Sequence, residues 1–152
     1  MNEEAQQWIN RYVDAYLIVT RQISARIKER IPEGVTNDQF LILRLIKAQK
    51  LCTATYLAEA VSVGKSSITA IINRLDEAGM IERTRDENDR RLVYLSLTEQ
   101  GEEVYQLAEK QVQDVISPYL FHFEEEDIEK FITLFEKLAF IMQDPGTGGS
   151  NE

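Results

Sequence analysis

The sequence predicts a mainly α-helical fold that contains one small β-hairpin. Three observations lead to this prediction. Apolar residues recur at helical spacing along most of the 152 residues, two short stretches near the middle alternate apolar with polar residues, and Pro and Gly residues separate several of the periodic segments. The predicted order along the chain is four helices, then the hairpin, then two further helices.

The first predicted helix covers residues 3–31 and carries a broad apolar stripe that includes Tyr12 and Tyr16. Pro32 and Gly34 should end it, because both residues break helical periodicity. A helix with so wide an apolar stripe needs another surface to cover it.

The second predicted helix lies in the stretch TNDQFLILRLIKAQK. Thr36 is the expected N-cap, and Gln39 three residues later completes a capping box. Phe40, Leu43 and Ile46 recur at helical spacing, so they should form one apolar face.

The third and fourth predicted helices form a pair joined by a short turn, TATYLAEAVSVGKSSITAIINRLDEAG. In the third helix Leu57, Ala58 and Val61 should point inward. We expect Gly64 to adopt the left-handed backbone conformation that a sharp turn needs. Gly79 should follow the end of the fourth helix as its C′ residue.

Two strands and two long helices complete the prediction. MIERTR and LVYLSL alternate apolar and polar residues on either side of a polar loop, so they should pair as a hairpin. Thr98 should cap a fifth helix, which Pro118 should kink or end. EEEDIEKFITLFEKLAFIM should form the sixth, with acidic residues over its first turn. The Gly-rich residues 144–152 should form a flexible tail.

A helix-turn-helix pair followed directly by a hairpin is the winged helix-turn-helix arrangement. We therefore expect a single domain over residues 1–152, with the winged helix-turn-helix lobe at residues 36–97. This lobe is too small to cover the long apolar helices at residues 3–31 and 98–143. A second copy of the chain related by a twofold axis is the simplest cover, so both segments should be dimerisation helices.

The fourth helix is the expected recognition helix. In a helix-turn-helix motif the second helix enters the major groove of DNA, with its N-terminal residues toward the base edges. Residues 65–74 include no acidic residue, and small, hydroxylated and cationic side chains suit contacts with bases and phosphates. An amphipathic helix with a merely solvated polar face is the alternative. The residues predicted to contact DNA are Lys65, Ser66, Ser67, Thr69, Ala70, Asn73 and Arg74.

The hairpin loop, RTRDENDRR, concentrates arginine within an acidic chain. A cation at the tip of a wing suits the narrow, electronegative minor groove. Asp89 stands two residues before Arg91, so its carboxylate can hold that guanidinium extended. The alternative is a self-neutralised solvated turn, since three carboxylates share the loop. The wing residues predicted to serve DNA binding are Arg83, Arg85, Asp89, Arg90 and Arg91.

Charge is unevenly distributed along the chain. The formal net charge is −9, but residues 44–91 hold nine Lys and Arg against seven Asp and Glu. This middle region is therefore less repulsive to a polyanion than the rest of the chain taken together.

Other features of the composition exclude several classes of protein. The chain has one cysteine, no apolar leader at its start, and no apolar run near the ~20 residues that span a bilayer, so we expect a cytoplasmic protein without disulfides that does not enter membranes. It contains no HExxH, CxxC or Gly-rich phosphate loop, so we expect neither an enzyme nor a cofactor. The single histidine, His122, lies beside acidic residues but does not by itself indicate a metal site.

The region LAEAVSVGKSSITAIINRLDEAGMIERTRDENDRRLVYLSLTEQG resembles the signature region of the MarR (multiple antibiotic resistance regulator) family of bacterial transcription factors. The resemblance includes the Asp-x-Arg of the wing at residues 89–91, followed by Leu97, Thr98 and Gly101. It implies a homodimeric repressor that binds a pseudo-palindromic operator and releases this DNA when it binds a small-molecule effector. Many members carry arginine directly after the recognition-helix threonine, where this chain has Ala70, so the resemblance does not give its operator sequence.

The resemblance also suggests where an effector would bind, between the dimer helices and the DNA-binding lobe. Tyr12, Tyr16, Phe40 and Arg44 are the candidate pocket residues, although the aromatic side chains could equally pack in the dimer core.

Two alternative functions stay open. In some members thiol oxidation releases DNA, which here would require Cys52, but its apolar neighbours favour a buried, unreactive thiol. The acidity of the chain would also fit a winged-helix protein-interaction module that does not bind DNA.

Overall fold

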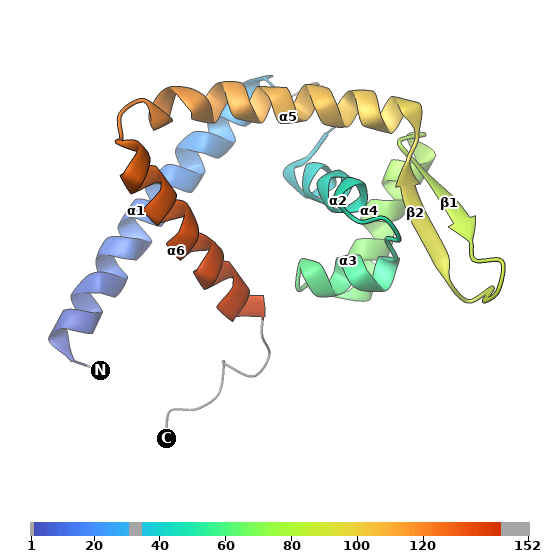
Figure 1. Cartoon of the computed structure of the whole chain (residues 1–152), viewed down its shortest axis with the longest axis horizontal. Helices are drawn as coiled ribbons and strands as arrows, with labels where there is room; N and C mark the ends of the chain where they lie inside the picture. Colours follow the sequence, from blue (N-terminus) through green and yellow to red (C-terminus); the bar gives the residue numbers. More distant parts are fainter. Residues whose placement is uncertain (1, 31–34, 144–152) are drawn as a thin grey trace.

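The computed structural model describes residues 2–30 and 35–143, and within them the predicted order of helices and strands is confirmed (Figure 1). The helix break at Pro32 and Gly34 and the tail at residues 144–152 lie outside the described residues. The elements are α1 (Glu3–Arg30), α2 (Asn37–Ala48), α3 (Ala54–Ala60), α4 (Lys65–Glu77), β1 (Ile81–Arg85), β2 (Val93–Leu97), α5 (Glu99–Leu120) and α6 (Glu125–Gln143).

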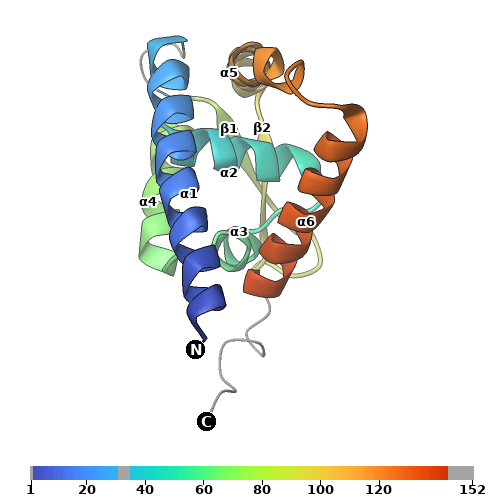
Figure 2. The ribbon, with the colours of Figure 1, turned by 90° about the vertical axis from the view of Figure 1, so that its left-hand side faces the viewer.

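Helix α5 runs along one side of the molecule and joins two parts of different character (Figure 1). At its N-terminal end lies a compact lobe made of α2, α3, α4 and the hairpin, whereas α1 and α6 extend from its other end. Although α1 and α6 cross in Figure 1, they are well separated in Figure 2. The two long helices therefore do not cover each other.

The lobe has a continuous apolar core, to which every one of its elements contributes. Leu43 from α2, Leu57 from α3 and Leu75 from α4 are fully buried. Leu95 of β2 and Tyr105 of α5 belong to the same core. The hairpin and the first turns of α5 are thus packed into the same unit as the helix-turn-helix pair.

The hairpin is antiparallel, with Ile81 opposite Leu97 and Arg85 opposite Val93. On its other edge β2 also forms an isolated bridge, in which the amide of Leu95 donates to the carbonyl oxygen of Cys52 over 2.8 Å. This bridge fixes the hairpin to the segment that precedes α3.

Several predicted helix boundaries are confirmed. Thr36 and Gln39 form both hydrogen bonds of the capping box at the start of α2. The Thr98 hydroxyl accepts from the amide of Gly101 over 3.0 Å and donates to the carbonyl of Gly79 over 2.6 Å. Gly79 has a φ of +71°, the left-handed conformation expected of a C′ glycine.

The prediction for Gly64 is wrong. Gly64 is the N-cap of α4 with a φ of −63°, and it is Ser62 that adopts the left-handed conformation, with a φ of 52°. The reason lies at the end of α3, where the amide of Ser62 bonds the carbonyl of Glu59 and the amide of Val63 bonds that of Ala58. This Schellman pattern requires a left-handed residue directly after the helix cap, whatever its side chain.

Helices α1 and α6 expose most of their apolar side chains. Ile27 is the one buried residue of α1, and α6 has none. Helix α5 continues for two residues beyond Pro118 before it ends. Among the residues that the structure describes, no helix is both long and apolar enough to cross a bilayer.

Candidate nucleic-acid interface

Helix α4 presents an uncapped, acid-free N-terminus to solvent. Its N-cap is Gly64, which has no side chain to bond the first amides, and its first turn holds no acidic residue. The unpaired amides at a helix N-terminus and the helix dipole both attract phosphate. Lys65 is the first residue of this turn, and its side chain is exposed.

The outward face of α4 gathers all the residues predicted for the recognition helix. Ile68, Ile72 and Leu75 form the buried face, so the helix is turned with its polar side outward. The Thr69 hydroxyl donates to the carbonyl of Lys65 over 2.8 Å, so its remaining lone pairs and its methyl group are what it offers outward. The exposed residues are Lys65, Ser66, Ser67, Thr69, Ala70, Asn73 and Arg74.

Asp86 organises the turn of the wing. Its Oδ1 accepts from the amides of Asn88 and Asp89, both over 2.8 Å, and its Oδ2 accepts from the hydroxyl of Tyr94 over 3.2 Å. The amides of Asp89 and Asn88 hold the pKa of the Asp86 carboxyl below its ordinary value. Desolvation, together with the neighbouring Asp86, raises the pKa of Tyr94. Sequence reasoning gave Asp86 and Tyr94 no role, although an Asp two residues before a turn amide is an Asx-turn signal.

The predicted pairing of Asp89 with Arg91 is confirmed. Nε of Arg91 donates to Oδ1 over 3.1 Å and Nη2 donates to Oδ2 over 3.2 Å, which is a two-point contact. The same guanidinium and the Arg91 amide lower the pKa of Asp89. The Arg91 side chain is nevertheless 91% exposed, so the carboxylate fixes its direction without removing it from solvent.

The other arginines of the hairpin differ in their surroundings. Arg85 and Arg90 are exposed and form no ion pair with any residue in the described part of the chain. Arg83 is instead directed at α4, where it contacts Asn73 and Asp76. The sequence offered no signal for Asp76, because this contact joins a helix to a strand several residues further along.

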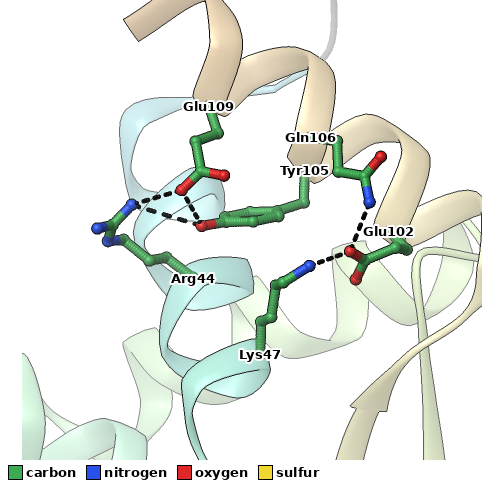
Figure 3. Close-up of polar contacts among 6 residues, drawn as sticks. All are labelled: Arg44, Lys47, Glu102, Tyr105, Gln106 and Glu109. Carbon is green, nitrogen blue, oxygen red and sulfur yellow. Dashed lines mark hydrogen bonds and ion pairs between the residues drawn. The ribbon is translucent and has the colours of Figure 1, made fainter. Parts of the chain in front are cut away.

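A second polar cluster ties the winged helix-turn-helix lobe to α5 (Figure 3). Nη1 of Arg44 donates to Oε1 of Glu109 over 3.0 Å and to the hydroxyl of Tyr105 over 3.4 Å. That hydroxyl donates in turn to Oε1 of Glu109 over 2.6 Å. Desolvation, followed by the hydrogen bond to Glu109, raises the pKa of Tyr105.

Lys47 and Glu102 form a further ion pair one helical turn away (Figure 3). Lys47 also lies over the ring of Tyr105, with its Nζ 5.1 Å from the ring centroid. Gln106 donates to the same carboxylate oxygen of Glu102 over 2.9 Å. Lys47, with help from Gln106, lowers the pKa of Glu102. Each contact between α2 and α5 in this cluster therefore involves a charged group.

The candidate effector residues fall into two pairs. Phe40 stacks on Tyr105 of α5 with ring centroids 5.7 Å apart, close to Arg44. Tyr12 and Tyr16 stack on each other along α1, at 5.8 Å. A surface hollow beside this second pair is lined by α1 residues alone, namely Trp8, Arg11, Tyr12, Asp14, Ala15 and Ile18. The lining of this hollow includes Tyr12 but neither Phe40 nor Arg44.

Cys52 is fully buried within the lobe. Its Sγ lies 3.9 Å from the carbonyl oxygen of Thr53, and burial raises the pKa of the thiol to about 11. Because the thiolate is the reactive form, this site is typical of a structural cysteine.

The chain is similar in sequence and in fold to known transcriptional regulators. The sequence model of the MarR family matches residues 35–93. The HTH-type transcriptional regulator YwhA of Bacillus subtilis (strain 168) is 31% identical over 124 residues, which cover 82% of this chain and 87% of YwhA. A solved structure of a MepR-like protein complexed with pseudoligands is 29% identical, with a TM-score of 0.63 and coverage of 90% of this chain and 94% of that one. A mutant MarR from E. coli complexed with operator DNA is 23% identical, with a TM-score of 0.71 and coverage of 86% and 94%.

Proposed function

The chain belongs to the MarR family of transcriptional regulators, and from that premise we propose that it binds a pseudo-palindromic operator as a homodimer and represses transcription until a small-molecule effector releases it. It is a DNA-binding regulator and not an enzyme. Because the proposed activity requires chromosomal DNA, we place the protein in the cytoplasm.

One observation carries the proposal, which is that the hairpin packs on α4 while the N-terminal turns of this helix stay exposed. Helix α4 packs on β1, so the exposed residues of the helix and the loop of the hairpin belong to one rigid lobe. A helix of this kind fits the major groove with its first turns toward the bases. Arg91, held extended by Asp89, then suits the adjacent minor groove, whose negative potential attracts a guanidinium. The E. coli MarR mutant has a similar fold and was solved in complex with operator DNA, which supports a DNA-binding role for this fold.

Unsatisfied apolar surface supports the homodimer. A 19-residue helix with no buried residue, such as α6, is not expected to persist alone in water. Large apolar side chains are exposed along α6 and α1, among them Phe131, Phe135, Trp8 and Leu17. A second copy of the chain, related by a twofold axis, would bury both helices and present two copies of α4 to DNA.

The cluster between α2 and α5 supports release by an effector. Two recognition helices must lie ~34 Å apart to reach successive turns of one DNA face. Arg44 and Lys47 hold the DNA-binding lobe against α5 through exposed or half-exposed ion pairs, which a ligand can replace at little cost. A ligand bound there would change the angle between the lobe and the dimer helices, and therefore the spacing. The complex of the MepR-like protein with pseudoligands supports ligand binding in a relative of this fold.

Selection of genomic DNA fragments by the purified full-length protein tests the proposal. We expect enrichment of a few promoter fragments that share an inverted repeat, with affinity falling steeply as salt rises. A screen for compounds that release the recovered operator then identifies the effector class. Failure to enrich any DNA, together with no salt-dependent binding, would contradict the proposal and favour a protein-interaction module.

A further inference from the structure

Arg83 lies on β1, but its guanidinium is directed at the neighbouring recognition helix. Its Nη2 donates to Oδ1 of Asn73 over 2.7 Å, and its Nη1 lies 3.4 Å from Oδ2 of Asp76. Asn73 and Asp76 are three residues apart in α4, so they are neighbours on the helix surface. Arg83 therefore bridges the strand and the helix through both of its terminal nitrogens.

Asn73 lies on the face of α4 that the proposed function directs into the major groove. It follows Ser66 by seven residues and Ala70 by three, and this spacing places all three side chains on one stripe of the helix. All three are exposed. The hydrogen-bonding groups that Asn73 offers outward are therefore available to read a base.

We propose that Arg83 is a positioning residue, which engages the amide oxygen of Asn73 and leaves the amide NH₂ group to read a base that offers acceptors, with guanine preferred over adenine. The inference rests on the proposed function, because it requires α4 to lie in the major groove. A guanidinium has only donors, so the oxygen of the Asn73 amide must face it and the NH₂ group must point away. The positive charge of the donor strengthens this bond relative to a neutral one.

The chemistry of the bases gives the preference. A free asparagine reads adenine through two bonds, since it donates to N7 and accepts from N6. When Arg83 holds the amide oxygen, the accepting half of that pair is weakened. Guanine presents O6 and N7, both acceptors, so an NH₂ group alone can read it. Asp76 completes the arrangement because it fixes the other end of the guanidinium.

Selection from a randomised DNA library tests the inference on the full chain and three variants. With the unmodified chain we expect guanine to be enriched over adenine at least about fivefold at one base pair of each half-site. Asn73→Ala should remove the preference at that base pair alone. Arg83→Ala frees the amide oxygen, so the preference there should shift toward adenine, whereas Arg83→Lys should keep guanine because an ammonium can donate to the same oxygen.

Arg85→Ala is the matched control, since Arg85 is exposed two residues further along the same strand. It should lower affinity for all sequences alike and reduce the dependence of log affinity on log salt by about 1, as expected for a phosphate contact. If Arg83→Ala behaves like this control and keeps the guanine preference, Arg83 contacts phosphate and the inference is overturned. It is likewise overturned, with the proposed function intact, if Asn73→Ala alters no base preference. If the unmodified chain enriches no DNA at all, the proposed function itself fails.

Discussion

At the scale of single residues, the wing shows how a chain of net charge −9 can direct a cation outward. Asp89 contacts Arg91 at two points, yet the arginine remains almost fully exposed. The carboxylate limits the conformations that the side chain samples, so less conformational entropy is lost when it enters a groove. Acidic residues in this loop therefore favour the proposed contact with DNA.

We predict that Arg91→Ala weakens operator binding by roughly 5- to 150-fold, the range of a good specific contact. Fluorescence anisotropy with the selected operator measures the change. Lys110→Ala serves as the control, because Lys110 is an exposed cation of α5 that pairs only with Asp114 among the described residues. Unchanged affinity for Arg91→Ala would remove the wing from the proposed interface.

Burial should make the Cys52 thiol unreactive. A pKa of about 11, against an ordinary 9.0, leaves about a hundredfold less thiolate at neutral pH. We predict that a thiol reagent labels the folded protein at least a hundredfold more slowly than the denatured chain, and that peroxide does not release DNA through this residue. Labelling at equal rates in both states would contradict the expected low reactivity, and peroxide release that Cys52→Ala abolishes would establish a redox role.

At the scale of elements, the junction between the end of α4 and the start of α5 depends on a close approach. A Cβ atom on Gly101 would lie 1.8 Å from the carbonyl oxygen of Met80, which is backbone and cannot move aside alone. We predict that Gly101→Ala lowers the free energy of unfolding by at least about 1–3 kcal/mol, the usual cost of overpacking.

Urea denaturation measures this loss, and Gly64→Ala provides the control. A Cβ atom on Gly64 meets only the Ser66 hydroxyl oxygen, at 3.9 Å, so the change should stay within about 1 kcal/mol. Equal stability of the two variants would show that the α5 junction relaxes without strain.

The carboxylates of Asp86 and Asp89 should stop stabilising the turn of the wing only at acidic pH. The pKa values of Asp86 and Asp89 lie below the ordinary 3.8, so their charged forms stabilise the turn above that pH. This stabilisation should disappear as the pH falls through the lowered values. NMR titration of the two carboxyl groups should give midpoints below 3.8. Arg91→Ala should raise the midpoint of Asp89 alone, and midpoints at or above 3.8 in the unmodified chain would refute this description of the turn.

Sequence patterns within a few residues predicted most of the helices and strands. Contacts between side chains that are distant in the sequence could not be predicted from such patterns. The capping box of Thr36 and the cap at Thr98 depend on residues within one turn, so their spacing is visible in the sequence. The bond from Arg44 to Glu109 spans 65 positions, and the contact between Arg83 and Asn73 exists only because the hairpin packs on α4. Ser62 shows a further limit, because its left-handed conformation follows from the end of α3 and not from its own side chain.

At the scale of the whole molecule, charge and apolar surface are segregated along the chain. Residues 44–91 hold nine Lys and Arg against seven Asp and Glu, whereas α5 and α6 together hold ten acidic residues against three basic ones. The lobe is therefore less repulsive to a polyanion than α6, which extends from the other end of α5 (Figure 1). Helices α1 and α6 expose the apolar surface that a second copy would cover, so the proposed dimer contact and the proposed DNA contact would use different parts of the molecule (Figure 1).

The most direct test of the central claim is a hydroxyl-radical footprint of the full-length protein on its selected operator. Two lobes joined by twofold-related helices should protect two half-sites on one face of the DNA, with centres about 10–10.5 base pairs apart or a whole multiple of that spacing. Protection of a single half-site would contradict a dimer that reads DNA through α4 and the wing. Binding that persists in high salt without protecting either half-site would contradict it as well.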